Sequence, residues 1–225
     1  MFQILQPDRG RKIRAVLFDL DGVVIDTEKL YTRFWMEAAA GMGFPMTLAQ
    51  ALQLRSLGRG PSQEKLDSFF GTGAVDYLAL RARRIELMDV FIARHGVEEK
   101  KGIRQLLECL RERGIPCAIT SSSSIPVITR HLTALGLIGG FTALCSGKDV
   151  PRGKPAPDIY LHGAAVLGVA PEHCLAIEDS PAGIESAWRA GCMPIIVPDQ
   201  DQPDGLTLSR CYAKADSLID VMELL

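Results

Sequence analysis

The sequence has few of the features that mark secreted, membrane-spanning or nucleic-acid-binding proteins. Its 225 residues include six cysteines but no C-x-x-C pair and no histidine or cysteine spacing typical of a zinc site. No segment approaches the roughly 20 apolar residues that span a bilayer, and the N-terminal segment does not resemble a signal peptide. The net charge of −2, from 25 basic and 27 acidic residues, gives no broad positive field for nucleic acid or anionic membranes.

The composition that remains is that of a globular protein with a small-molecule partner. The hydrophobic content of 47% is enough to bury a core in one large domain or two smaller ones. We expect the cysteines to be reduced thiols of that core, because most have apolar neighbours. We also expect a cytoplasmic protein, because the sequence shows no signal peptide and no membrane span, and a monomer, because it shows no coiled-coil pattern and no exposed apolar stripe.

Apolar strand-like runs alternate with helical patterns, which favours a parallel α/β sheet covered on both faces. The first strand is predicted at residues 13–18. Residues 28–96 are helical in pattern without a convincing strand, so we predict an all-helical insertion there. The alternation then resumes, with strands predicted at 116–120, 143–145, 174–177 and 194–197 and helices at 103–113, 126–135, 157–167, 181–190 and 217–224.

The first predicted strand ends in two aspartates that are two residues apart. Residues at positions i and i+2 of a strand point the same way, so Asp19 and Asp21 can address one small volume beyond its carboxyl end. Open α/β sheets hold their ligands at that edge. Gly22 then permits a sharp exit from the strand.

Three later segments place polar groups at comparable positions. The strand at 116–120 runs into Thr120 and four serines, 121–124, which offer hydroxyls and free amides at a helix N-terminus, where an anion such as phosphate would bind. Lys154 lies in a proline-rich loop, where its ammonium can meet an anion. The strand at 174–177 runs into Glu178 and Asp179.

Converging carboxylates repel one another unless a cation lies between them. Because no histidine or cysteine lies in these motifs, the hard oxygen ligands favour Mg²⁺ over zinc. Each motif also has a structural explanation: a turn for Asp19–Gly22, a helix cap for the serines, a solvated side chain for Lys154, and helix-dipole compensation for Glu178 and Asp179.

Taken together, the motifs resemble those of the haloacid dehalogenase superfamily, in its helical-cap branch of phosphoglycolate phosphatase-like and β-phosphoglucomutase-like enzymes. They are DLDGVVIDT at 19–27, TSS at 120–122, GKPAPDIY at 153–160 and EDSPAGIESA at 178–187. The resemblance implies a Rossmann-like, doubly wound catalytic core over residues 1–27 and 97–225, with a helical cap domain over 28–96.

The resemblance also implies roles for individual residues. Asp19 would attack phosphorus to form an aspartyl-phosphate, and Asp21 would act first as general acid and then as general base. Ser121, with Thr120 as the alternative, and Lys154 would hold the phosphoryl group, beside Gly22 and Ser122. The implied Mg²⁺ ligands are Asp19, the backbone carbonyl of Asp21, Asp179 and, directly or indirectly, Glu178.

Asp21 favours phosphoryl transfer over dehalogenation. An alkoxide leaving group needs a proton from a general acid, whereas an expelled halide does not. The dehalogenases and phosphonate-cleaving members of the superfamily lack an aspartate at this position. The predicted substrate is therefore a small phosphate monoester.

Substrate choice is expected to reside in the helical insertion. Arg55 and Arg59 resemble basic residues of the specificity loop and could clamp a distal anionic group, or they could be solvated arginines. β-Phosphoglucomutases carry a histidine where this chain has Tyr31, which favours a phosphatase, whereas the two arginines favour a mutase. A third possibility is a non-catalytic protein that binds phosphorylated metabolites.

Overall fold

The computed structural model describes residues 2–6, 12–54, 57–199 and 202–225. Contacts within the chain divide it into two compact units. The first, here called the sheet unit, comprises Met1–Asp26 and Glu98–Leu225, and the second, the helical unit, comprises Thr27–Val97. The sheet unit is therefore built from two segments of sequence that are separated by the helical unit.

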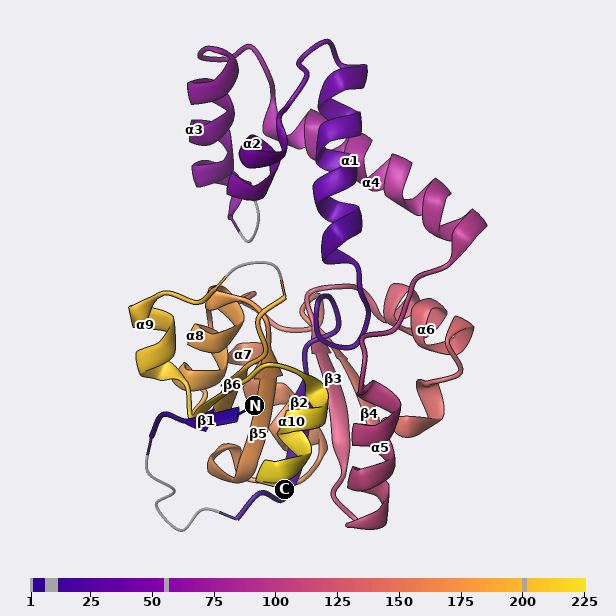
Figure 1. Ribbon diagram of the computed structural model, residues 1–225, viewed down its shortest axis with the longest axis vertical. Coiled ribbons are helices and arrows are strands. Elements are labelled where there is room, and N and C mark those ends of the chain that lie inside the picture. The colour runs from indigo at the N-terminus through magenta and orange to yellow at the C-terminus, as the bar shows by residue number, and fades with distance from the viewer. Residues whose placement is uncertain (1, 7–11, 55–56, 200–201) are drawn as a thin grey trace. The chain divides into compact units, whose positions relative to one another are not determined.

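The sheet unit is organised around seven strands (Figure 1). Their order across the sheet is β1-β7-β6-β5-β2-β3-β4, and every neighbouring pair is parallel except β1 with β7. The strands are β1 (Phe2–Ile4), β2 (Ala15–Phe18), β3 (Cys117–Ser121), β4 (Ala143–Ser146), β5 (Cys174–Glu178), β6 (Met193–Ile196) and β7 (Ala213–Ala215). The fully buried β2 lies between β5 and β3, at the centre of the parallel part.

Helices flank this sheet (Figure 1). They are α5 (Ile103–Glu112), α6 (Ile125–Ala134), α7 (Asp158–Val166), α8 (Pro181–Arg189), α9 (Gly205–Arg210) and α10 (Leu218–Val221), with 3-10 turns at Ile138–Gly140, Pro171–His173 and Met222–Leu224. One core cluster joins α7 and α8 to the side chains on one face of the strands, including Leu17, Ala118 and Ala176. Within this cluster, Ala15 and Leu17 of β2, like Cys174 and Ala176 of β5, are two residues apart, as expected for one covered face of a sheet.

The predicted fold class is confirmed, with differences at the sheet edge. The predicted first strand, 13–18, is in fact the second, because Phe2–Ile4 pairs antiparallel with β7. The sequence pattern predicts none of β1, β7 and α9. Both strands have three residues, too few to show a periodic pattern. The predicted last helix, 217–224, is a short α-helix followed by a 3-10 turn.

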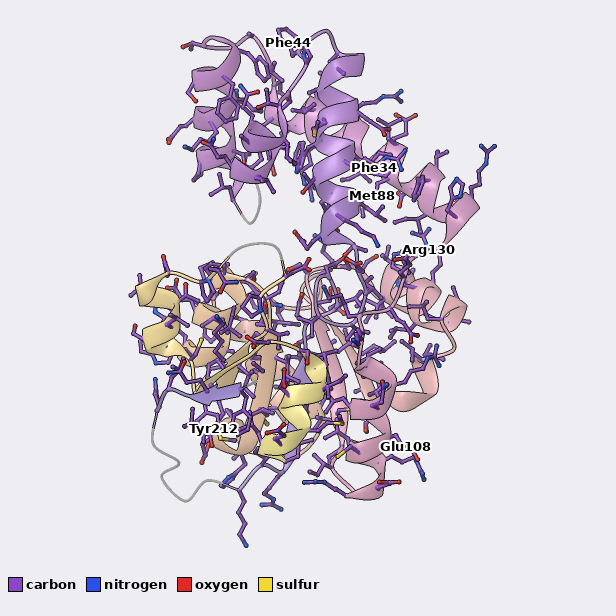
Figure 2. All side chains as sticks on the ribbon, viewed as in Figure 1. Phe34, Phe44, Met88, Glu108, Arg130 and Tyr212 are labelled. Carbon is purple, nitrogen blue, oxygen red and sulfur yellow. The ribbon has the colours of Figure 1, made fainter. Side chains whose placement is uncertain are left out.

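The helical unit contains α1 (Glu28–Gly41), α2 (Leu48–Gln53), α3 (Arg59–Phe70) and α4 (Tyr77–His95). Phe34 of α1 and Met88 of α4, both labelled in Figure 2, belong to one apolar cluster between these helices. A second cluster includes Trp35 and Leu66. The N-terminus of α4 is capped by Asp76, whose carboxylate accepts a hydrogen bond from the backbone of Ala79 at 2.7 Å.

Two further observations concern the cysteines and the length of the helices. All six cysteines lie in the sheet unit as free thiols, and five are buried, as the sequence predicts. Burial raises the pKa of Cys117 and of Cys211 to about 12. Among the described residues, no helix is both long enough and apolar enough to cross a membrane.

We predict that Gly163→Ala destabilises the protein. A Cβ atom at Gly163 of α7 would lie 2.7 Å from Cγ2 of Thr120 and 3.1 Å from Cδ2 of Leu17, so α7 would have to move off the sheet. Overpacking of this kind costs about 1–3 kcal/mol, more than the roughly 0.5–1 kcal/mol that alanine gains over glycine in a helix. The measurement is the free energy of unfolding in urea, followed by circular dichroism.

Gly205→Ala is the matched control for this prediction. Gly205 begins α9, and a Cβ atom there would meet nothing within 4 Å. We expect its free energy of unfolding to equal or exceed that of the unchanged protein. Equal stability of the Gly163 and Gly205 variants would contradict the close packing of α7 on the sheet.

Candidate active site

Three adjacent strands deliver polar side chains to one edge of the sheet. β2 lies between β5 and β3, and all three run parallel, so their carboxyl ends meet at that edge. Asp19 directly follows β2, Ser121 is the last residue of β3, and Glu178 is the last residue of β5. The edge therefore gathers residues that are far apart in the sequence, at the position where open α/β sheets bind ligands.

The chain folds into a tight loop after Asp19. The backbone amides of Val24 and Ile25 both donate to the carbonyl of Leu20, and the amide of Gly22 donates to the carbonyl of Ile25 at 2.9 Å. Gly22 has a φ of +82°, which only glycine adopts readily. The glycine thus has the conformational role that the sequence predicts, and Asp21 lies half-buried in the loop.

Lys154 links the carboxyl ends of β2 and β5. It lies in the loop between β4 and α7, and its Nζ donates to Oδ1 of Asp19 and to Oε1 of Glu178, each at 2.5 Å. The Lys154 and Asp19 side chains are only 10% and 12% exposed, and that of Glu178 is fully buried. Such charge-assisted contacts are stronger than neutral hydrogen bonds, because little water screens them.

Glu178 is held by groups on several elements. Oε1 also accepts a hydrogen bond from the hydroxyl of Tyr160 on α7 at 2.6 Å, and Oε2 accepts one from Oγ of Ser180 at 3.1 Å. Ser180 in turn caps α8 by accepting from the amide of Gly183. A Cβ atom at Gly183 would lie 1.9 Å from the Glu178 carboxyl group, so only glycine fits there.

Burial and neighbouring charges shift the pKa values of this cluster. Burial, assisted by the charges of Glu178 and Asp21 and opposed by Lys154, raises the pKa of Asp19 to about 8. Burial opposes the charge of Lys154, but the carboxylates of Asp19 and Glu178 outweigh it and raise the pKa of the lysine. Lys154 therefore offsets only part of the cost of ionising Asp19.

The arrangement of carboxylates fits a divalent cation. Asp19, Glu178 and Asp179 each offer one oxygen, and these oxygens all lie within 4.8 Å of one another. An all-oxygen donor set suits a hard cation such as Mg²⁺. A cation there would also favour the ionised carboxylate of Asp19. Among the described residues, this cluster does not include the Asp21 carboxylate, and the expected use of the Asp21 backbone carbonyl as a ligand stays a prediction.

The hydroxyl groups of Thr120 and Ser121 differ in their hydrogen bonds. The hydroxyl of Thr120 is fully buried and donates to the carbonyl of Phe18 at 3.2 Å. Oγ of Ser121 accepts from the amide of Ser123 at 3.0 Å, which leaves its own proton for another acceptor. Ser122 is exposed beside it.

The structure describes one of the two arginines of the predicted specificity loop. Arg55 lies outside the described residues. Arg59 is exposed and begins α3. Their expected role in substrate binding therefore stays a prediction.

Sequence reasoning missed Tyr160, Ser180 and Gly183 as parts of the site. Their contacts with Glu178 depend on how α7 and α8 meet the strand edge, which no local pattern specifies. One available signal was that all three lie in the motifs quoted above, within ten residues of a predicted site residue.

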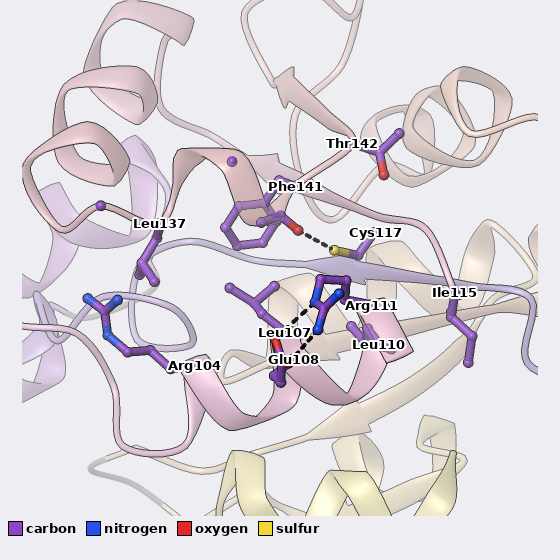
Figure 3. Close-up of a pocket in the computed structure, with 13 residues that line it drawn as sticks. Arg104, Leu107, Glu108, Leu110, Arg111, Ile115, Cys117, Leu137, Phe141 and Thr142 are labelled. Atoms are coloured by element: carbon purple, nitrogen blue, oxygen red, sulfur yellow. Dashed lines mark hydrogen bonds and ion pairs between the residues drawn. The ribbon is translucent and has the colours of Figure 1, made fainter. Parts of the chain in front are cut away.

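Two pockets of the sheet unit differ in their chemistry. One, of about 220 Å³, is lined in part by Ser122 and by Lys154, which contacts the carboxylates of Asp19 and Glu178. A larger one, of about 480 Å³, is lined by α5 and the turn around Phe141 (Figure 3). It contains Arg111, which is paired with Glu108, and Cys117, but no group of converging carboxylates. Of these two pockets, the smaller is lined by residues of the predicted site, Ser122 and Lys154, so it is the candidate active-site pocket.

Comparisons with known proteins agree with this geometry. The family model of haloacid dehalogenase-like hydrolases matches residues 13–191. Hexitol phosphatase A of Escherichia coli is 33% identical, over 83% of this chain and 83% of that protein. β-Phosphoglucomutase of Bacillus subtilis is 34% identical, over 85% of each chain. The crystal structure of a β-phosphoglucomutase homologue from Thermotoga maritima is 26% identical with a TM-score of 0.74, covering 94% of this chain and 98% of that one.

We predict that Gly183→Ala weakens binding of divalent cations. The added methyl group would overlap the Glu178 carboxyl group and force it out of the carboxylate cluster. Because a cation site depends on the spacing of its oxygens, we expect the dissociation constant for Mg²⁺ to rise about tenfold or more. Isothermal titration calorimetry measures this constant directly.

Gly153→Ala serves as the control, since Gly153 precedes Lys154 and a Cβ atom there would meet nothing within 4 Å. We expect its affinity for Mg²⁺ to match that of the unchanged protein. If the Gly183 variant bound Mg²⁺ equally well, Glu178 would not belong to the cation site.

Proposed function

Because the chain belongs to the haloacid dehalogenase-like hydrolases, we propose that it is a Mg²⁺-dependent phosphatase of small, sugar-like phosphate monoesters. Family membership and the phosphatase and phosphomutase relatives support an enzyme that acts on phosphate. The observation that carries the finer proposal is the position of Asp19. This buried carboxylate at the end of the central strand contacts a lysine and lies in an acidic cluster.

The proposed reaction has two steps. A carboxylate oxygen of Asp19 attacks phosphorus, and the bond to the leaving oxygen breaks as Asp21 gives that oxygen a proton. The products are a free alcohol and an aspartyl-phosphate. A water molecule then attacks the phosphorus while Asp21 takes its proton. The bond between Asp19 and phosphorus breaks, which releases inorganic phosphate and restores the Asp19 carboxylate.

Asp19, Glu178, Asp179 and the backbone carbonyl of Asp21 are the proposed ligands of Mg²⁺. The bound ion would supply positive charge that offsets both the carboxylates and the phosphoryl oxygens. Tyr160 and Ser180 hold the Glu178 carboxylate in place through the hydrogen bonds described above. These two residues therefore orient a ligand without touching the substrate.

Lys154 and Ser121 are the proposed partners of the phosphoryl group. The ammonium of Lys154 already contacts Asp19, so it would lie beside any phosphoryl group that Asp19 attacks. Ser121 is preferred to Thr120, because the hydroxyl proton of Thr120 is donated to a backbone carbonyl. Ser121 can instead donate to a phosphoryl oxygen.

The second candidate is a phosphosugar mutase, which the similarity to β-phosphoglucomutase of Bacillus subtilis favours. A mutase must protect its aspartyl-phosphate from water until a second hydroxyl group arrives. Mutases carry a histidine for this purpose at the position of Tyr31. In this chain the guanidinium carbon of Arg84 lies 4.6 Å from the centroid of the Tyr31 ring, inside the helical unit. A tyrosine in place of that histidine supports the phosphatase over the mutase.

Asp19→Asn is predicted to abolish turnover of p-nitrophenyl phosphate in the presence of Mg²⁺. The amide has nearly the same shape but is a poor nucleophile, so we expect kcat to fall by about 10³-fold or more. Asp204→Asn is the matched control, because Asp204 caps α9 and asparagine caps helices equally well. Retained activity in the Asp19 variant would remove the proposed nucleophile.

The choice between phosphatase and mutase is tested with β-glucose 1-phosphate and catalytic amounts of glucose 1,6-bisphosphate. Phosphorus NMR separates released inorganic phosphate from glucose 6-phosphate. We expect inorganic phosphate to form faster than the isomer, because Tyr31 lacks the role of the mutase histidine. Faster formation of glucose 6-phosphate would establish the mutase instead.

A further inference from the structure

The pocket beside the carboxylate cluster has a second lysine in its wall. The pocket measures about 220 Å³, and its lining residues are Ser122, Gly147, Lys148, Gly153, Lys154 and Ile159. Lys148 comes two residues after β4, so it reaches the edge from the strand next to β3. None of the four motifs identified in the sequence contains this residue.

Hydrogen bonds fix the loop that carries Lys148 against the serine loop. The amide of Gly147 donates to the carbonyl of Ser121 at 2.7 Å, and Oγ of Ser146 donates to the carbonyl of Ser123 at 2.8 Å. The amide of Lys148 donates to the same Ser146 oxygen at 3.0 Å, and Ser146 is fully buried. The backbone of Lys148 is thus held in register with the proposed phosphoryl-binding serine.

The two lysines of the pocket differ in their electrostatic environment. The charge of Lys154 is shared between Asp19 and Glu178, so much of it is already compensated. Within the described part of the chain, Lys148 forms no ion pair, and its side chain is exposed. A phosphate monoester carries close to two negative charges at neutral pH, which one shared ammonium does not balance.

We propose that Lys148 is a further substrate-binding residue, whose ammonium binds the dianionic phosphate group in this pocket. The inference rests on the proposed function, since it assigns a phosphate monoester to the site. Lys148 binds the charge of the phosphate group in the free monoester, the transition state and the product phosphate alike. It therefore determines KM more than kcat, because binding that is equal in the ground and transition states does not change the rate of the chemical step.

The test compares Lys148→Ala, Lys148→Arg and Lys12→Ala with the unchanged protein. Lys12 is an exposed lysine that precedes β2, at the opposite end of the strand from Asp19, and so controls for loss of one positive charge. The readouts are KM and kcat for p-nitrophenyl phosphate, and the dissociation constant of inorganic phosphate from titration calorimetry with Mg²⁺ present. Circular dichroism melting establishes that each variant is folded.

For Lys148→Ala we expect KM and the phosphate dissociation constant to rise about fivefold or more, with kcat within about threefold of its original value. Lys148→Arg should restore most of the affinity, because it restores the charge. The dependence of kcat/KM on ionic strength should also weaken in the alanine variant and not in Lys12→Ala.

Two results would overturn the inference. One is a KM and a phosphate dissociation constant that both stay within about twofold in Lys148→Ala, and the other is a loss confined to kcat. Failure of the proposed function is separate from both. It would appear as no turnover of any phosphate monoester by the unchanged protein, and phosphate titration of the two alanine variants would still decide whether Lys148 binds the anion.

Discussion

The contact of one ammonium group with two carboxylates is the interaction on which the site depends. Lys154 contacts both Asp19 and Glu178, and these residues come from loops and strands that are distant in sequence. Placing charges away from water costs several kcal/mol for each ion unless partners compensate them. Asp19 and Glu178 also offer oxygens that lie within 4.8 Å of an oxygen of Asp179. Carboxylate oxygens this close to one another repel, and a divalent cation between them would relieve that repulsion.

The parallel arrangement of strands makes this convergence possible. Because β5, β2 and β3 are neighbours and run in one direction, their last residues reach the same edge without any long loop. The helices then restrict what those residues can do. Tyr160 on α7 and Ser180 at the start of α8 bind the carboxylate of Glu178 from different directions. The absence of a side chain at Gly183 leaves room for that carboxylate.

The sequence was sufficient to predict the parallel core, the helical insertion and the acidic strand ends, because each has a local signal. Short apolar runs ending in Asp19 and Glu178 indicate strands that lead into a polar edge. The same reasoning could not choose between Thr120 and Ser121. The choice depends on which of the two hydroxyl groups donates to the Phe18 carbonyl in the folded protein. Nor could it find β1 and β7, which form a pair through contacts between the two ends of the chain.

The distribution of cysteines gives the two units different chemical reactivities. All six thiols belong to the sheet unit, five are buried, and burial raises the pKa of Cys145 and of Cys174 to about 11. A thiolate is the reactive species, so an alkylating reagent would modify these sulfurs only when the surrounding strands separate. The helical unit, Thr27–Val97, has no cysteine at all. Alkylation rates of the five buried thiols, unlike that of the partly exposed Cys109, therefore report opening of the sheet unit alone.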